Sequence, residues 1–333
     1  MSAIAPLSTE VSPVAGEELW LRCAACSAEI GPIADRDDGG PTADIQCAQC
    51  GAVTHKKRGV WRTLGSQQRA QFEAFLRDYE EIRRREGRGS THPAFYLALP
   101  FADLTGNFKQ QWEIRGRSYR FLERRILPKL EMDYGKELRV LDIGAGNGWL
   151  SYRLALSGYR PVAVDLSCNA WDGLEAAVHF SDVLADLFPR FEAEMDNLPF
   201  GVAQFDVAIF NASFHYSTNY ADTLREVLRC LRPGGTVLIV DSPTYSNPGS
   251  GEAMRIERKR QFESTFGTRS DALATSDFLT PEIVGELAGL GIRWERHLPW
   301  YGMRWWLRPW MARWKRRREP SQFYIYQGRT ELS

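Results

Sequence analysis

The sequence predicts an α/β fold whose central sheet is mainly parallel. Short runs of apolar and β-branched residues recur between positions 138 and 240 and alternate with helical stretches, a βαβαβ order. The first of these runs, Val140 to Ile143, leads into a glycine-rich turn and then a helix. In an open parallel sheet, ligands bind outside the carboxyl ends of the strands. We therefore expect the functional residues at these strand ends.

The glycine-rich turn predicts a nucleotide-type cofactor. Gly144, Gly146 and Gly148 alternate with Ala145 and Asn147, and glycine lets a backbone turn tightly and approach a ligand closely. Asp142 ends the strand before this turn. A carboxylate here would repel a pyrophosphate seated at the turn, so we expect a cofactor without phosphate.

Two further acids fit the same interpretation. Asp165 ends the run that begins at Pro161 and lies 23 residues after Asp142, close to the roughly 20-residue interval at which an acid reaches ribose hydroxyls. Asp196 follows a third expected strand, where it could accept a hydrogen bond from an exocyclic amine such as that of adenine. Residues 205–211 and 231–240 predict a fourth and a fifth strand.

These segments, in this order and with the Arg-Pro-Gly-Gly turn before the fifth strand, resemble the class I S-adenosylmethionine-dependent methyltransferases over residues 138–240. The resemblance implies a Rossmann-like seven-stranded sheet with helices on both faces. It implies S-adenosyl-L-methionine as methyl donor, with ribose at Asp165, adenine at Asp196 and the sulfonium beside Asn211. The expected cofactor-binding residues are Asp142, Gly144, Gly146, Gly148, Asp165, Asp196 and Asn211.

The N-terminal region carries two Cys-x-x-Cys pairs, Cys23 with Cys26 and Cys47 with Cys50, separated by 20 residues. This spacing is typical of a zinc ribbon, in which four thiolates close a tetrahedral structural site. Disulfides are the alternative, and a reducing compartment disfavours them. We therefore expect these four cysteines to bind Zn²⁺ in a small domain that precedes the sheet.

The order of segments predicts three parts. Residues 1–62 form the zinc ribbon, residues 63–135 a linker with cofactor-covering helices, and residues 136–333 the methyltransferase core with substrate insertions at 242–280 and 299–321. Apolar residues at helical spacing predict one helix over 67–86 and another over about 107–130. Arg115, Arg117 and Tyr119 on the second helix are candidates for the cofactor carboxylate, although a solvated basic face is the simpler explanation and is favoured over that role.

Catalytic residues are expected where the fourth strand ends. His215 and Tyr216 follow it, and a histidine can accept a proton from a hydroxyl or an acidic carbon near neutral pH. Packing is the simpler explanation of this histidine, and methyl transfer can proceed by positioning alone. At the start of the first insertion and within it, Asp241, Tyr245 and Arg255 are candidates for contact with the acceptor, and a solvated loop explains them equally well.

The second insertion is rich in tryptophan and arginine. Residues 299–321 hold five tryptophans and seven basic residues against Glu319 alone, in a chain whose net charge is zero. Tryptophan with arginine suits an anionic membrane surface and also suits the bases and phosphates of RNA. The third explanation is a basic helix that packs its tryptophans on the sheet.

The sequence thus favours a methyltransferase acting on a small-molecule or lipid-like biosynthetic intermediate, with peripheral membrane contact through 299–321. The alternative is a ribosomal or transfer RNA base methyltransferase that grips RNA with the ribbon and the tryptophan segment, since such a ribbon also resembles that of ribosomal-RNA guanine methyltransferases. A non-enzymatic protein that binds partners through the ribbon is a third hypothesis. Neither a signal peptide nor an apolar span of about 18 residues is evident, so we expect a cytoplasmic protein.

Overall fold

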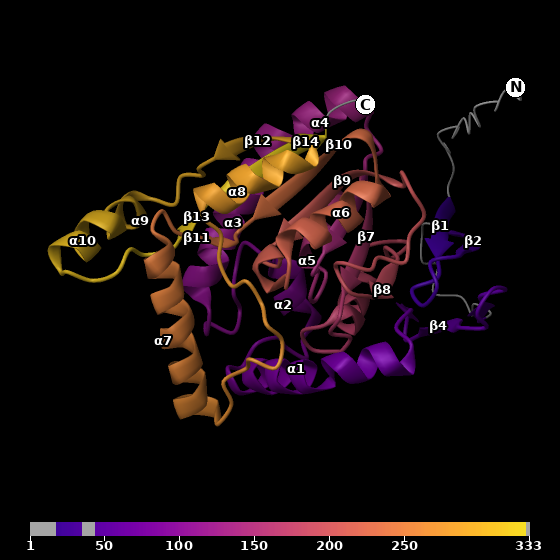
Figure 1. The fold of residues 1–333 in the computed structure, drawn as a ribbon, viewed down its shortest axis with the longest axis horizontal. Coiled ribbons are helices and arrows are strands. Elements are labelled where there is room, and N and C mark those ends of the chain that lie inside the picture. The colour runs from indigo at the N-terminus through magenta and orange to yellow at the C-terminus, as the bar shows by residue number, and fades with distance from the viewer. Residues whose placement is uncertain (1–17, 35–43, 331–333) are drawn as a thin grey trace, which may run out of the picture.

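The computed structural model describes residues 18–34 and 44–330. Within them a ten-stranded sheet runs through the centre of the molecule, with helices on both faces (Figure 1). The strand order is β12-β14-β10-β9-β6-β7-β8-β5-β4-β3. Its first seven strands form the expected seven-stranded methyltransferase sheet, which is confirmed. No helix among the described residues has the length and apolar composition needed to span a bilayer.

The parallel part of the sheet matches the strands expected from the sequence. It contains β6 (Arg139–Ile143), β7 (Arg160–Asp165), β8 (Arg190–Glu192), β9 (Phe205–Asn211) and β10 (Leu231–Val240). After the insertion at 299–321 the chain forms β13 (Gln322–Phe323) and β14 (Ile325–Thr330). β14 runs antiparallel between β10 and β12 (Ile292–His297), whereas β13 pairs with β11 (Pro243–Thr244).

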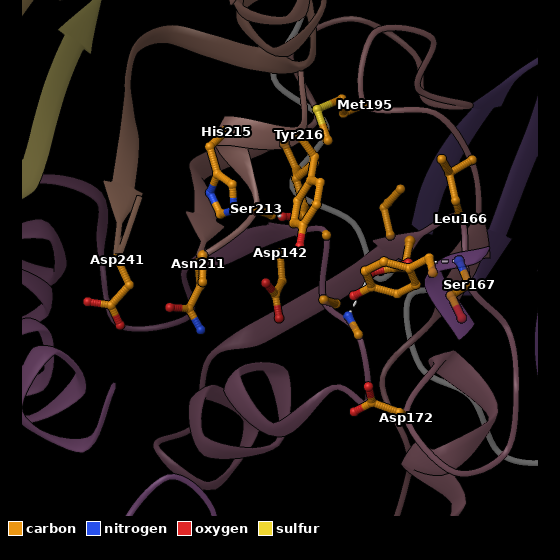
Figure 2. Close-up of a pocket in the computed structure, with 18 of the residues that line it drawn as sticks. Asp142, Leu166, Ser167, Asp172, Met195, Asn211, Ser213, His215, Tyr216 and Asp241 are labelled. Atoms are coloured by element: carbon orange, nitrogen blue, oxygen red, sulfur yellow. Dashed lines mark hydrogen bonds between the residues drawn. The ribbon is translucent and has the colours of Figure 1, made fainter. Parts of the chain in front are cut away.

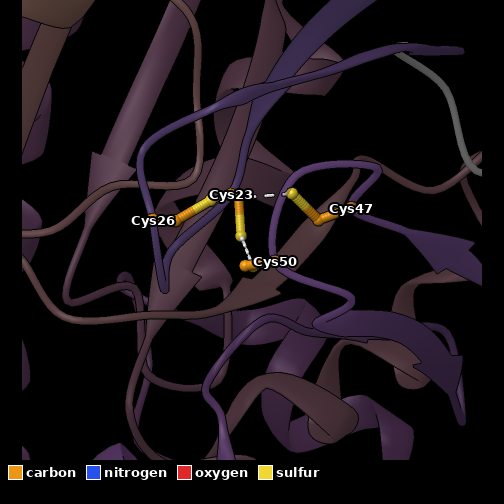
Figure 3. A group of neighbouring side chains, drawn as sticks. All are labelled: Cys23, Cys26, Cys47 and Cys50. Carbon is orange, nitrogen blue, oxygen red and sulfur yellow. Dashed lines mark hydrogen bonds between the residues drawn. The ribbon is translucent and has the colours of Figure 1, made fainter.

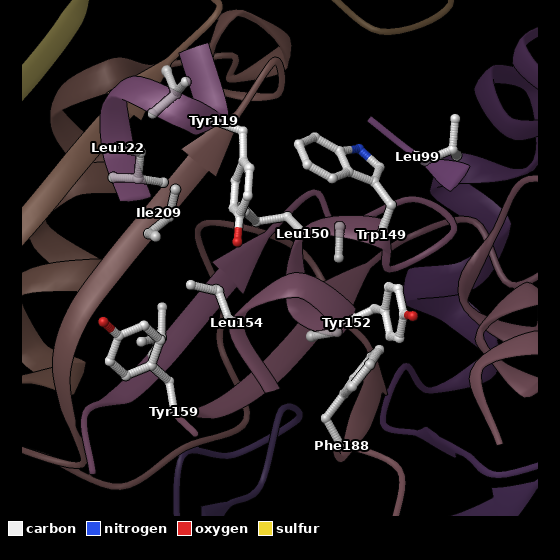
Figure 4. Close-up of a cluster of buried hydrophobic side chains, with 14 of the residues drawn as sticks. Leu99, Tyr119, Leu122, Trp149, Leu150, Tyr152, Leu154, Tyr159, Phe188 and Ile209 are labelled. Carbon is white, nitrogen blue, oxygen red and sulfur yellow. The ribbon is translucent and has the colours of Figure 1, made fainter. Parts of the chain in front are cut away.

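Alternating side chains along each strand fill two cores, one on each face of the sheet. Along β9, Val207 and Ile209 belong to the first core and Ala208 and Phe210 to the second. The first core is covered by the aromatic-rich helices α3 (Lys109–Phe121), α4 (Leu127–Tyr134) and α5 (Trp149–Leu156), which Figure 4 shows in part. The second is covered by α6 (Tyr220–Cys230) and α8 (Pro281–Leu287).

α1 (Ser66–Arg85) runs along one side of the molecule, and α2 (Pro93–Ala98) follows it (Figure 1).

The expected helix over 107–130 is divided into α3 and α4 by a π-helical turn at Leu122–Ile126. α7 (Pro248–Phe266) begins after Asn247, whose side chain caps the helix by accepting a hydrogen bond from the Gly249 N–H. Residues 303–306 and 308–314 form α9 and α10.

The cysteine-rich region packs directly on the core and shares its sheet. Its hairpin, β1 (Glu18–Arg22) with β2 (Glu29–Ala34), is bonded to the core through backbone contacts from Trp20 and Arg22. Its other strands, β3 (Ile45–Gln46), β4 (Val53–Lys57) and β5 (Val60–Arg62), extend the central sheet, and β5 pairs in parallel with β8. The region expected to be a separate ribbon, part of which lies outside the described residues, therefore continues the sheet of the core.

A buried ion-pair network stabilises the contact between β5 and β8, here called the joint. Arg62 on β5 contacts Glu175 at 2.6 Å and Glu192 at 3.6 Å, and all three side chains are almost entirely buried. Two exposed arginines add to the network: Arg58 lies 3.1 Å from Glu175, and Arg69 lies 2.5 Å from Glu192. Buried charges are costly to desolvate, so removal of the central cation would leave two carboxylates poorly compensated.

We expect Arg62→Ala to lower the free energy of unfolding by about 3 kcal/mol, because it removes the buried partner shared by two carboxylates. Urea unfolding followed by circular dichroism measures the change. Arg77→Ala is the matched control, since Arg77 is largely exposed and its pair with Asp78 is 3.6 Å long. The control should lose less than about 0.5 kcal/mol. Equal losses in the two variants would contradict a stabilising role of the joint.

Candidate cofactor and acceptor site

A cavity of about 380 Å³ lies at the carboxyl ends of the parallel strands. This size is typical of small-molecule sites. Figure 2 shows Asp142, Asn211 and Asp241 at the ends of β6, β9 and β10, which are neighbours in the sheet. The structure places in the lining six of the seven expected cofactor-binding residues and both expected catalytic residues: Asp142, Gly144, Gly146, Asp165, Asp196, Asn211, His215 and Tyr216.

The glycine-rich turn lies close to the chain that follows β9 and to the end of β7. Gly144 has φ +73°, and a Cβ there would lie 2.3 Å from the Cβ of Ser213, so a larger residue would collide with the end of β9. The Gly146 N–H donates a hydrogen bond to Asp165 Oδ2 at 2.8 Å. Gly148 lies outside the cavity lining, where it caps α5 with φ +77°. The turn thus brings backbone, rather than side chains, to the cavity wall.

Two buried acids stand on either side of this turn. Asp142 Oδ2 accepts a hydrogen bond from the Ser151 hydroxyl at 2.8 Å, while its Oδ1 has no partner in the described chain. Burial raises the pKa of Asp142 to about 7. Asp165 also accepts from the Ser167 N–H at 2.7 Å, and burial raises its pKa. These carboxylates face the cavity and can accept hydrogen bonds from a cationic or hydroxyl-bearing ligand.

Asp196 lies at the rim of the cavity in the turn after β8. Its side chain is exposed, whereas the adjacent Glu194 is partly buried. Burial and the nearby Asp196 carboxylate raise the pKa of Glu194 to about 7. Met195 lies between them and offers an apolar surface to the cavity. This combination of acceptors and an apolar side chain suits a planar base with an exocyclic amine.

The wall of the cavity contains three arginines. These are Arg83, Arg88 and Arg115. Arg83 forms an ion pair with Asp172, whereas Arg115 lies over the Trp112 ring at 4.8 Å. Burial, with the neighbouring arginines, lowers the pKa of Arg115 to about 10, so it keeps its charge at neutral pH. The Arg115 guanidinium can therefore hold a carboxylate.

The two other candidates from the same helix lie elsewhere. Arg117 forms an ion pair with Glu113 at 2.6 Å, and Tyr119 packs in the core against Trp149. Neither side chain lines the cavity. Arg115 is therefore the member of that trio that lines the cavity.

The expected catalytic residues line the same cavity, and Arg115 lies within electrostatic range of His215. His215 is buried, and its Nδ1 lies 3.5 Å from the Ser242 hydroxyl. Burial lowers the pKa of His215 to about 3, so its imidazole is neutral at physiological pH. Tyr216 packs edge-on against Phe75 and Tyr79 of α1.

Asp241 also lines the cavity. It accepts a hydrogen bond from the Ser118 hydroxyl, and its Oδ2 has no partner in the described chain. Burial raises the pKa of Asp241 to about 6. Ala212 and Asp241, which directly follow β9 and β10, have φ of +55° and +54°. Non-glycine residues adopt this conformation at a cost, and such strain is concentrated at functional sites.

Sequence reasoning missed several lining residues. The apolar face of the helix over 67–86 was expected, but its position over the cavity was not. Asp172 had no local motif to mark it. Tyr245 and Arg255, expected near the acceptor, lie outside the lining, where Tyr245 packs on Phe278 and Arg255 pairs with Glu252. The missed residues from α1 are Phe72, Phe75, Leu76, Tyr79 and Arg83.

The four N-terminal cysteines form a separate cluster (Figure 3). Their sulfur atoms all lie within 4.8 Å of one another, with Cys23 Sγ 3.6 Å from Cys50 Sγ and Cys26 Sγ 3.6 Å from Cys47 Sγ. Four sulfurs at the usual Zn–S length of about 2.3 Å would stand about 3.8 Å apart in a tetrahedron. The donor set and its spacing therefore fit a zinc ion.

The strand order, the glycine turn and the row of strand-end acids define a class I methyltransferase architecture. Residues 141–239 match the family model described as a methyltransferase domain, so the chain contains such a domain. This match covers the strands that carry Asp142, Asp165 and Asn211.

Known proteins similar to this chain include malonyl-acyl-carrier-protein O-methyltransferase of Erwinia pyrifoliae, 34% identical over 104 residues, which are 31% of this chain and 37% of the relative. Demethylmenaquinone methyltransferase of Mycobacterium tuberculosis is 32% identical over 113 residues, 34% of this chain and 44% of the relative. The chain thus spans less than half the length of these two relatives. The structure of the Bacillus subtilis YcgJ protein aligns with a TM-score of 0.44 at 18% identity, over 60% of this chain and 94% of that one.

We expect Asp165→Ala to weaken S-adenosylmethionine binding by roughly 30-fold or more, because charged hydrogen bonds contribute about 1.5–3 kcal/mol each and a ribose offers two hydroxyls. Isothermal titration calorimetry measures the affinity. Asp165→Asn is the matched variant, which keeps one carbonyl acceptor and should lose less. An unchanged affinity in Asp165→Ala, with an unchanged melting temperature, would refute the ribose assignment.

Proposed function

We propose that the protein is an S-adenosylmethionine-dependent methyltransferase acting on a small-molecule or lipid-like biosynthetic intermediate. The observation that carries this proposal is one cavity, in a methyltransferase domain, that combines cofactor-type groups with a strained, partly unsatisfied acid, Asp241.

The cavity residues divide into two sets by chemistry. Asp165 would hold the ribose and Asp196 the adenine amine. The unpartnered Asp142 Oδ1 suits the ammonium of the methionine part, and Arg115 suits its carboxylate. Asn211, at the end of β9, would lie beside the sulfonium. When bound there, the cofactor supplies a methyl group already activated by a positively charged sulfur.

The lining of the cavity suits an organic acceptor with an apolar part. Phe72, Phe75 and Leu76 of α1, together with Phe323, give this cavity apolar walls. Two similar proteins are named for acceptors of this kind, a malonyl group on acyl-carrier protein and demethylmenaquinone. We infer from both observations that the acceptor is a small or lipid-like molecule.

The chain's own residues would orient the acceptor and take its proton. We infer that the neutral His215 accepts a hydrogen bond from the acceptor and that Tyr216 packs against it. The bound cofactor would supply the methyl group to this acceptor and would retain the electron pair on its sulfur, so the chain has only to receive the acceptor's proton. The acceptor's proton passes to Asp241, whose pKa of about 6 makes it a stronger base than His215, with a pKa of about 3.

We also propose a structural role for zinc at the four cysteines. The Ala24 carbonyl, between Cys23 and Cys26, accepts hydrogen bonds from Asn197 at 2.9 Å and from Gln68 at 3.3 Å. Asn197 follows Asp196, and Gln68 lies in the first turn of α1. A rigid metal-bound loop would thus support both the turn that carries Asp196 and helix α1, which covers the cavity.

The substrate class is tested by transfer of a labelled methyl group from S-adenosylmethionine into extracts of the source cell. Label should appear in the organic-soluble fraction. Label in nuclease-sensitive material would overturn the proposal in favour of an RNA substrate. Asp165→Ala provides the inactive control.

The pH dependence of the reaction tests the proton acceptor. We expect kcat to rise as the pH increases through about 6 and then level off, because the Asp241 carboxyl must lose its proton to act as a base. Asp241→Asn should lower kcat by about 100-fold or more and remove this dependence. His215→Gln should lower kcat while the midpoint stays near 6. Loss of the midpoint in His215→Gln alone would instead assign the proton to His215.

Metal analysis tests the zinc proposal. Freshly purified protein should contain about one zinc per chain, and Cys26→Ser should release it and lower the melting temperature. Cys168→Ser is the matched control, since Cys168 lies in the core and outside the cluster. Zinc below about half occupancy in the unaltered protein would contradict the proposal.

A further inference from the structure

The segment from residue 298 to 317, here called the arm, exposes an unusual amount of apolar surface. Of the seventeen large hydrophobic side chains that are exposed among the described residues, eight lie in this segment. Trp314 is 82% exposed and Trp310 66%. In Figure 1 the arm, which contains α9 and α10, projects from the body of the molecule. The eight side chains are Leu298, Trp300, Met303, Trp306, Leu307, Trp310, Met311 and Trp314.

Six of these side chains follow helical spacing. Positions 303, 306, 307, 310, 311 and 314 are separated alternately by three residues and one, the pattern of a single helix face. The backbone stays helical across the boundary of α9 and α10, because Leu307 bonds to Met303 and Met311 bonds to Leu307. The arm is therefore amphipathic, with its apolar face toward solvent.

The inner face of the arm is anchored to the protein. Trp305 stacks on Phe323 at 5.5 Å, and Arg308 lies over the Trp305 ring at 3.8 Å. Tyr301 at the base bonds to Ser118, which in turn bonds to Asp241. The sequence analysis gave packing of the tryptophans on the sheet as one explanation. Trp305 does pack inward, on Phe323 of β13, whereas the remaining tryptophans of the arm are exposed.

The arm also carries charge that nothing in the described chain neutralises. Its exposed cations are Arg304, Arg313, Lys315, Arg316 and Arg317. None of these five forms an ion pair with a described residue. Arg318, just beyond the arm, differs because it pairs with Glu257 at 2.7 Å. A basic surface of this kind attracts an anionic partner.

We propose that the arm docks on an anionic lipid bilayer, with its tryptophan face in the headgroup region and its cations on the lipid phosphates. Indole rings favour the interface because they are apolar with one polar N–H. An amphipathic helix with Trp and Leu on one face and Lys and Arg on the other is typical of interfacial binding. A bilayer satisfies the apolar and cationic surfaces together.

Docking would bring the cavity near the bilayer. The arm leaves and rejoins the body between β12 and β13, and Phe323 of β13 lines the cavity. Glu319 fixes this return by accepting hydrogen bonds from the Ser246 and Asn247 N–H groups at about 3.1 Å. The delivery of a lipid-like acceptor by this route rests on the proposed function, whereas the docking itself does not.

Sedimentation of the full chain with lipid vesicles tests the docking without any methyl transfer. The protein should bind vesicles of phosphatidylcholine with 30 mol% phosphatidylglycerol and bind pure phosphatidylcholine far more weakly. Arg316→Gln/Arg317→Gln should weaken binding roughly 30-fold, because each cation near an anionic surface contributes about 1 kcal/mol. Trp310→Ala/Trp314→Ala should weaken it about tenfold or more.

Matched variants separate the arm from general surface effects. Arg124→Gln/Arg125→Gln removes two exposed cations elsewhere, and Leu104→Ala/Met132→Ala removes two exposed apolar side chains elsewhere. Both controls should bind vesicles as the unaltered protein does. Failure of the unaltered protein to bind, or equal loss in arm and control variants, would overturn the proposal. Self-association in solution that the tryptophan variant abolishes, without vesicle binding, would instead assign the surface to a second copy of the chain.

Vesicle binding and cofactor binding are independent measurements. Calorimetry with S-adenosylmethionine on the arm variants should give the affinity of the unaltered protein. Vesicle binding by a protein that fails to transfer methyl groups would refute the proposed function and leave the docking intact.

Discussion

The hydrogen bond from the Gly146 N–H to the Asp165 carboxylate joins the carboxyl ends of β6 and β7, and the site is built around it. In the conformation that this bond stabilises, the Gly144 backbone lies so close to Ser213 that a side chain at position 144 would collide with it. The same carboxylate accepts from Ser167, so its position is set from two sides. A cofactor that binds here meets a wall whose geometry is fixed before it arrives, which reduces the entropy that binding must overcome.

The second constraint is the continuity of the sheet from the core into the cysteine-rich strands. β5 lies next to β8, so the buried charges of Arg62, Glu175 and Glu192 meet at the joint. The chain then continues into α1, whose apolar face lines the cavity. The cysteine cluster is thereby linked to the cavity by covalent continuity and by hydrogen bonds at Ala24. This arrangement favours a supporting role for the region.

The sequence predicted the parallel strands and the strand-end residues well because both follow from local patterns. Asp142, Asp165 and Asn211 end short apolar runs, and parallel strands bring such ends to one edge. The position of α1 was not predictable, since an amphipathic pattern shows that a face is buried but not what it covers. The pKa values of His215 and Asp241 depend on burial by residues distant in the chain. The outward face of the arm likewise contradicts the usual assumption that apolar helix faces turn inward.

A crystal structure with S-adenosylhomocysteine tests the division of the cavity most directly. The account predicts the ribose hydroxyls on Asp165, the adenine amine at Asp196 and the sulfur beside Asn211. The space between that sulfur and Asp241 should remain open for the acceptor. A product bound with its sulfur turned away from Asn211, or bound outside this cavity, would contradict the account.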